Sequence, residues 1–194
     1  KKMDSTNLQS HISRQFNADL DQIRQRVLAM GGLVEQQIHG AIRALCEGNR
    51  LLGEEVIRKD TQVNAFEVMI DEECNRILAR RQPTASDLRL IVAVIKTITD
   101  LERIGDEAEK VARMATDLAS IESSRIAYPE VEHMGKHVAM MVHDTLDAFA
   151  RMDSEIALKI VQEDIKVDRE YEAIMRQCMT FMMEDPRTIR RVLD

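Results

Sequence analysis

The 194-residue sequence contains no tryptophan, only three prolines and seven glycines, and aromatic residues make up 3% of it. β-Sheets favour aromatic and β-branched residues and need frequent turns, so these shortages argue against a β-rich fold. The residues that dominate instead, among them Ala, Leu, Met, Glu, Arg and Gln, favour helices. The composition therefore predicts an all-α protein.

Long apolar runs are also missing, and none approaches the roughly 20 residues that a membrane-spanning helix requires. Residues 1–5 lack the apolar core of a secretory signal. Cys46, Cys74 and Cys178 are an odd number of cysteines with no CxxC pair, a pattern typical of reduced thiols in a protein core. We expect a cytoplasmic protein without membrane insertion.

The sequence also lacks an excess of basic residues, and its formal net charge is -7. Phosphate backbones require a basic face, so direct nucleic-acid binding is not expected. No P-loop, GxGxxG, GxSxG or helix-turn-helix signature is present, and no residues assemble a nucleophile, a base and an orienting group. His133 and His137 form an i,i+4 pair but lack the HExxH arrangement of zinc hydrolases. We predict that the protein is not an enzyme.

Apolar residues recur every three or four positions, which places them on one stripe of an α-helix. Gly48-Asn49, Gln82-Pro83 and Pro186 interrupt this pattern, as does the non-periodic stretch 120–130. The pattern predicts helices over about 12–45, 51–80, 86–118, 131–152 and 156–183, and the start of another at 188–194. Residues 84–87 resemble a capping box. Gly31-Gly32 indicates either a bend in the first helix or a close neighbour.

The second half of the sequence repeats the first, 104 positions later, without an insertion. Met30-Gly31 aligns with Met134-Gly135, and the other matching pairs are Val34/Val138, His39/His143, Ala44/Ala148, Asp60/Asp164, Val63/Val167, Ile70/Ile174 and Cys74/Cys178. We predict two tandem three-helix bundles. The first covers 1–119, a linker covers 120–130, and the second covers 131–194 and is truncated in its third helix. We expect further chain or a partner to cover the groove that this truncation leaves.

Pairs of oxygen-bearing side chains border the apolar stripes at i and i+4. The pairs are Glu102 with Asp106, Asp60 with Asn64, and Asp164 with Asp168. Members of a pair lie on nearly the same side of a helix, and two carboxylates there repel unless a cation separates them. Side by side, the second and third helices would place two pairs together, as in a carboxylate cage for hard cations. No histidine lies beside these pairs to complete the Glu-x-x-His motif of di-iron cages.

Three strings carry a family resemblance: TDLERIGD at 99–106, RRQPTASDLR at 80–89 and DTLDAFARMD at 144–153. Across essentially its whole length the sequence resembles the PhoU family of bacterial phosphate-signalling regulators. The resemblance implies a cytoplasmic negative regulator of the phosphate-starvation response that also modulates phosphate uptake. It further implies an adaptor between PstB, the ATPase of the phosphate ABC transporter, and the sensor histidine kinase PhoR. We also expect a homodimer.

The resemblance also implies metal binding, because the family's E(D)xxxD motifs hold iron or another divalent or trivalent metal. These motifs map onto Asp60, Asn64, Glu102, Asp106, Asp164 and Asp168. Asn64 departs from the pattern, and the family's second LERIGD string is absent. The alternatives are a metal-storage or di-iron-type bundle, and a purely structural helical dimer.

Overall fold

The computed structural model describes residues 3–80, 83–120 and 129–184, and the side chains among them from residue 16 onward. The described residues form five helices: α1 (Met3–Glu47), α2 (Arg50–Arg80), α3 (Ala85–Ser120), α4 (Pro129–Arg151) and α5 (Ser154–Glu184). The predicted all-α class is confirmed. The first helix begins at Met3 instead of near residue 12, because its polar N-terminal residues continue a helix without an apolar stripe.

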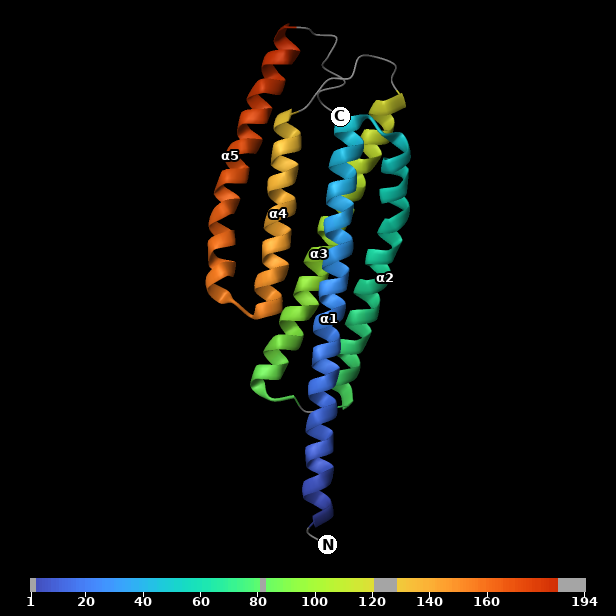
Figure 1. The fold of residues 1–194 in the computed structure, drawn as a ribbon, viewed down its shortest axis with the longest axis vertical. Coiled ribbons are helices and arrows are strands. Elements are labelled where there is room, and N and C mark those ends of the chain that lie inside the picture. The colour runs from blue at the N-terminus through green and yellow to red at the C-terminus, as the bar shows by residue number, and fades with distance from the viewer. Residues whose placement is uncertain (1–2, 81–82, 121–128, 185–194) are drawn as a thin grey trace.

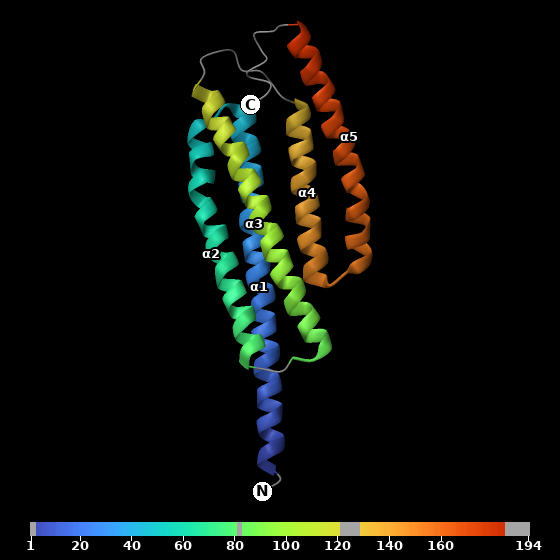
Figure 2. The same ribbon diagram turned by 180° about the vertical axis from the view of Figure 1, so that it is seen from behind.

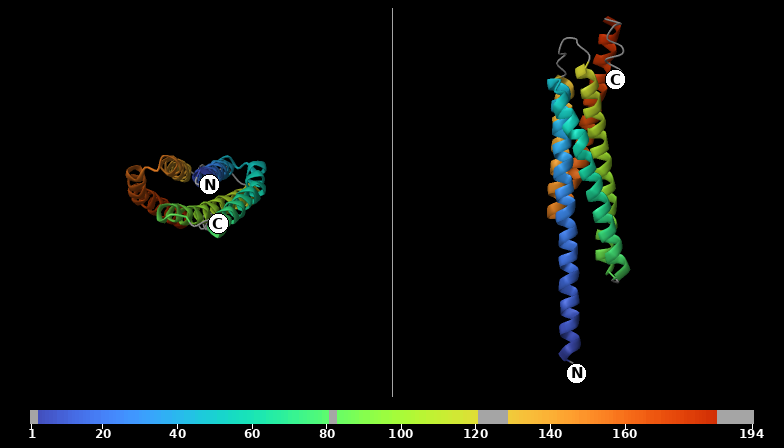
Figure 3. Two further views of the ribbon diagram at one scale, coloured as in Figure 1. Left: turned by 90° about the horizontal axis from the view of Figure 1, so that it is seen from below. Right: turned by 90° about the vertical axis from the view of Figure 1, so that its right-hand side faces the viewer.

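Helices α1, α2 and α3 form an up-down-up bundle in which each helix packs against the other two (Figure 1). The α4–α5 hairpin lies beside this bundle and joins it through contacts of α4 with α1 (Figure 2). Viewed end-on, α1 and α4 lie side by side in the middle, with α2 and α5 towards opposite ends (Figure 3). No described helix combines the length and apolarity needed to cross a membrane.

The core is built from the apolar stripes of the first three helices. Its fully buried side chains include Ile23, Met30, Ile70, Ile91 and Ile98. Four residues of α4 are buried, whereas α5 has none. The predicted stripe also included Leu88, but this side chain is 43% exposed because it lies in the first turn of α3, beyond the packed centre.

The two turns that precede α2 and α5 repeat each other in detail. Gly48 has a φ of 62° and Asn49 donates its backbone N–H to Ala44 O at 2.9 Å. At the equivalent positions, Met152 has a φ of 54° and Asp153 donates to Ala148 O at 2.9 Å. The 104-residue register predicted from sequence therefore also relates the backbone turns.

Two glycines allow α1 and α4 to approach closely. A Cβ at Gly31 would overlap Leu146 of α4, and a Cβ at Gly135 would overlap Ile42 of α1. Under the 104-residue shift Gly31 corresponds to Gly135 and Ile42 to Leu146. Each repeat therefore packs a branched aliphatic side chain from the equivalent position against the glycine of the other repeat. Of the two readings of Gly31-Gly32, a close neighbour is confirmed for Gly31. The two repeats are thus joined through a symmetric contact.

The remaining sequence predictions concern segments on which the structure gives little or no information. Most of the proposed linker falls at 121–128, and the proposed helix start at 188–194 follows α5; both lie outside the described residues. The domain boundaries at 119 and 131 therefore stay predictions.

The capping residues of α3 are described: Asp87 donates its N–H to Thr84 Oγ1 at 3.5 Å and its carboxylate accepts the Thr84 hydroxyl at 2.6 Å.

Candidate functional site

Acidic side chains of α2 and α3 meet where these helices pack together. Burial raises the pKa of Glu102, and the negative charges of Asp106, Glu67 and Asp60 raise it further, while Arg103 opposes them. Asp60 and Glu67 come from α2 and the others from α3. With Asn64, which hydrogen-bonds Asp60, the structure therefore brings together all four ligands predicted on α2 and α3, and Glu67 lies with them.

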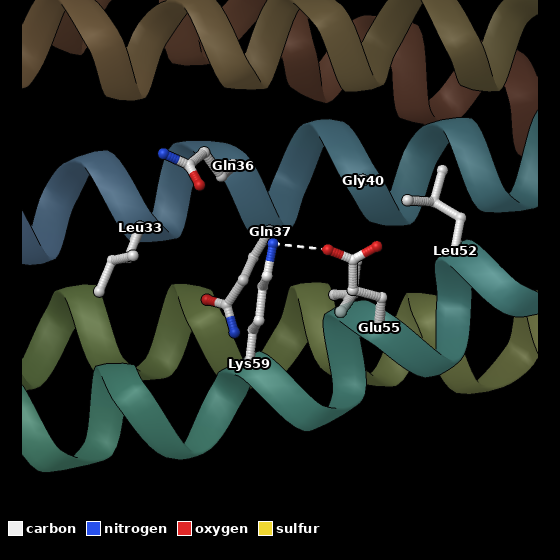
Figure 4. Close-up of a pocket in the computed structure, with 8 residues that line it drawn as sticks. Leu33, Gln36, Gln37, Gly40, Leu52, Glu55 and Lys59 are labelled. Atoms are coloured by element: carbon white, nitrogen blue, oxygen red, sulfur yellow. Dashed lines mark ion pairs between the residues drawn. The ribbon is translucent and has the colours of Figure 1, made fainter.

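Two amides hold Asp60 in place from different helices. Gln37 of α1 donates its Nε2–H to Asp60 Oδ1 at 3.0 Å, and Asn64 of α2 donates its Nδ2–H to Asp60 Oδ2 at 3.2 Å. Gln37 is only 3% exposed, and Figure 4 shows its side chain leaving α1 towards α2 beside the Glu55–Lys59 ion pair. Both Asp60 oxygens therefore accept a hydrogen bond, and these two contacts fix the orientation of the carboxylate.

Gly105 gives the LERIGD string its place in this arrangement. A Cβ on this residue would lie 2.9 Å from Gln37 Oε1, 3.4 Å from Val63 and 3.6 Å from Asp60 Oδ1. Only glycine lets α3 come this close to Gln37 and Asp60 without displacing them. The glycine inside the string is thus explained by the packing of α3 on both α1 and α2.

The donor set suits a hard cation in chemistry, but the side chains are not arranged around one point. Gln37 Oε1 and Asn64 Oδ1 are buried oxygens without a hydrogen-bond partner, and oxygen ligands are those that hard cations prefer. Within the described part of the chain, however, no three His, Cys, Asp or Glu side chains are placed to hold a metal ion. Binding a metal here would therefore require the acidic side chains to change conformation.

The acidic pair of the second repeat lies elsewhere. Asp164 and Asp168 are exposed on α5. Asp164 lines a groove of about 300 Å³ between α3, α4 and α5, whose other lining residues are apolar or threonine. Asp164 is the only acidic residue among those that line the groove. The described residues therefore place no second acidic pair opposite Asp164 and Asp168, as a metal site between two helices would need.

Sequence reasoning did not identify Gln37 as part of this site. The signal was present, because Gln37 lies three residues after Val34 and seven after Met30, on the apolar stripe of α1. A polar residue at a core position of a helix needs a partner. Glu73, 5% exposed on α2 and paired with Arg26 and Arg76, follows the same rule.

Comparisons with known proteins agree with this architecture. The model of the PhoU domain matches residues 27–115 and 131–194. The chain is 54% identical over 191 residues to "Phosphate-specific transport system accessory protein PhoU" of Escherichia coli (strain K12), covering 98% of this chain and 79% of that protein. It is 54% identical over 187 residues to the Pseudomonas aeruginosa homolog, covering 96% of this chain and 77% of that one.

Solved structures show the same likeness. A crystal structure of PhoU from Pseudomonas aeruginosa superposes with a TM-score of 0.88 at 54% identity, covering 92% of this chain and 85% of that one. The phosphate transport system regulatory protein PhoU from Streptococcus pneumoniae gives a TM-score of 0.81 at 29% identity, covering 88% and 80%. Domain matches in both halves, high identity over nearly the whole sequence and a shared fold show that this chain belongs to the PhoU family.

Proposed function

We propose that the protein is an accessory and regulatory component of a phosphate-specific transport system, which represses the phosphate-starvation response and modulates phosphate uptake. The observation that carries this proposal is the 54% identity to the Escherichia coli accessory protein over 98% of the chain. Regulatory function is also named for the Streptococcus pneumoniae protein that shares the fold.

The proposed role is that of a cytoplasmic adaptor without catalysis of its own. It contacts PstB, the transporter ATPase, and PhoR, the sensor kinase, and so passes the state of the transporter to the kinase. Long helix faces rich in charged residues suit such contacts. Homodimerisation belongs to the same proposal.

Complementation and binding together test the adaptor role. In a host lacking its own PhoU-family protein, the chain should restore repression of a phosphate-starvation reporter in high phosphate. Purified protein should retain both PstB and PhoR in pull-downs, with an unrelated acidic helical bundle as the control. Full complementation without binding to either partner would contradict the adaptor mechanism, and failure of both would contradict the function.

We further propose that the Asp60–Glu102 region binds iron or another divalent or trivalent metal as a structural or regulatory ligand. The raised pKa of Glu102 among three neighbouring acids favours this, because a cation would relieve their repulsion. Asp164 and Asp168 are the corresponding candidates in the second repeat.

Metal titration by calorimetry, with elemental analysis, tests this role. Glu102→Gln combined with Asp106→Asn should abolish binding, whereas Asp100→Asn combined with Glu107→Gln, at exposed positions of the same helix, should retain it. Metal bound equally by both double variants would contradict the assignment. Oxygen consumption by iron-loaded protein would favour the di-iron alternative, although α2, α3 and α5, which carry the acidic pairs, contain no histidine that could complete a Glu-x-x-His ligand motif there.

A further inference from the structure

The α4–α5 hairpin is held together differently from its counterpart in the first repeat. α5 packs against α4 yet contains no buried residue. Its apolar side chains Leu158, Val161 and Ile165 are 66%, 69% and 55% exposed. Because no side chain of α5 is fully buried, the polar contacts between α4 and α5 contribute a larger share to its position than such contacts do in a well-packed bundle.

Those polar contacts centre on His137. Its ring lies between two carboxylates of α5, with Nδ1 3.0 Å from Glu170 Oε1 and Nε2 3.7 Å from Glu163 Oε2. The His137 side chain is only 13% exposed. His133, one turn earlier and 74% exposed, lies 3.8 Å from Glu170 Oε2. One imidazole of α4 thus spans two acids that are seven residues apart on α5.

The first repeat has an apolar pair at the same place. A shift of 104 positions takes His137 to Leu33 and Glu170 to Phe66. Leu33 and Phe66 are partly buried and pack against the hydrophobic core. The positions that hold two core-facing apolar side chains in the first repeat therefore hold an imidazole and a carboxylate in the second.

A neutral imidazole cannot satisfy both acids. It carries one N–H, so if Nδ1 donates to Glu170, the lone pair of Nε2 faces the Glu163 carboxylate. Glu170 Oε2 is in addition buried without a hydrogen-bond partner, and a buried carboxylate oxygen in that state is unfavourable. A protonated ring carries an N–H on both nitrogens and a positive charge, which is attracted by both carboxylates.

Several other charged groups around α4 have partners of their own. On α5, Lys166 lies 2.7 Å from Glu163 and, mainly through its hydrogen bond, lowers the pKa of that acid, which keeps Glu163 charged. On the side facing α1, Glu35 contacts His143, Arg43 pairs with Glu47, and Lys136 pairs with Glu132. In the part of the chain that the structure describes, the ion pairs of His137 are with α5 alone.

We propose that His137 is a proton-operated clamp, which fastens α5 to α4 when its ring is protonated and loosens the hairpin when it is neutral. Imidazoles change charge between about pH 5 and 8, so docking of α5 strengthens as the pH falls through this range. This contact between α4 and α5 requires neither phosphate signalling nor metal binding between α2 and α3.

Hydrogen exchange of the full chain, corrected for the intrinsic effect of pH, tests the clamp. Amides of α4 and α5 should open roughly three- to tenfold more often at about pH 8 than at about pH 6. Core amides of α1 to α3 serve as an internal reference, since their opening should not follow this trend. A flat response of α5 in the unmodified protein would overturn the proposal.

Three variants identify the group that titrates. His137→Gln should remove the pH response. His137→Leu combined with Glu170→Phe, which copies the first repeat, should keep α5 docked at every pH. His143→Gln, at the exposed histidine that contacts Glu35, should respond like the unmodified protein. Persistence of the response in His137→Gln or in the double variant, or its loss in His143→Gln, would assign it to another group and overturn the proposal.

Discussion

At the scale of single residues, Glu102 is held in an unfavourable environment. Its pKa lies above the ordinary value of 4.5 because it is partly buried and faces Asp106, Glu67 and Asp60. At neutral pH the ionised group therefore destabilises the folded state relative to the unfolded one. As the pH falls through its raised pKa, the folded state takes up the proton first and this penalty is relieved.

Glu102→Gln should accordingly raise the melting temperature of the metal-free protein at pH 7, because it removes the repelling charge. The gain should shrink as the pH is lowered towards the range in which carboxyl groups protonate. Thermal unfolding followed by circular dichroism measures both effects, with the exposed Asp100→Asn as control. A variant less stable than the unmodified protein at pH 7 would show that Glu102 has a stabilising partner.

The three cysteines, predicted to be core thiols, differ in their surroundings. Cys74 is fully buried, and burial together with Asp71 raises its pKa to about 11. Cys46 and Cys178 are only half-buried, and all three are free. Because the thiolate is the reactive form, Cys74 should resist alkylation in the folded protein while Cys178 reacts, with Cys46 slowed by its raised pKa. Mass spectrometry of alkylated peptides measures the order, which should disappear in denaturant.

At the scale of helical elements, the turn between α4 and α5 carries a conformational cost that its counterpart avoids. Met152 occupies the left-handed region at φ 54°, where the first repeat has Gly48. A side chain there costs about 1–2 kcal/mol. Met152→Gly should stabilise the protein by about 1 kcal/mol, and Gly48→Met should destabilise it, in chemical denaturation. Met152 is 58% exposed, so the gain is not offset by lost core packing.

At the scale of the whole molecule, the two repeats depend on the close contact between α1 and α4. Gly31→Ala should cost on the order of 1 kcal/mol, because its Cβ must displace the buried Leu146. Gly32→Ala is the matched control, since nothing lies within 4 Å of a Cβ there. It should stabilise the protein by about 0.5–1 kcal/mol through helix propensity alone. Equal effects on the unfolding free energy at both positions would contradict the described α1–α4 contact.

The helices could be predicted because the spacing of apolar residues is a local property of each segment. The repeat could be predicted because one half of the sequence can be compared directly with the other. Apolar spacing and breaks at Gly48 and Pro83 gave the five described helices with ends within a few residues, apart from the start of α1. The repeated register placed the turn at Met152 opposite the one at Gly48. The pairs on α2 and α3 were expected to meet, because antiparallel neighbours align positions of similar depth.

The sequence by itself therefore determined the class of fold, the order of helices and which acids border the core. Only the tertiary structure decided what each side chain faces, since this depends on the rotation and crossing of whole helices. It set Gln37 against Asp60, placed Gly31 beneath Leu146 and put His137 between two acids of α5. Periodicity records which side of a helix is buried. Which side chain it contacts on the neighbouring helix depends on how all the helices pack together.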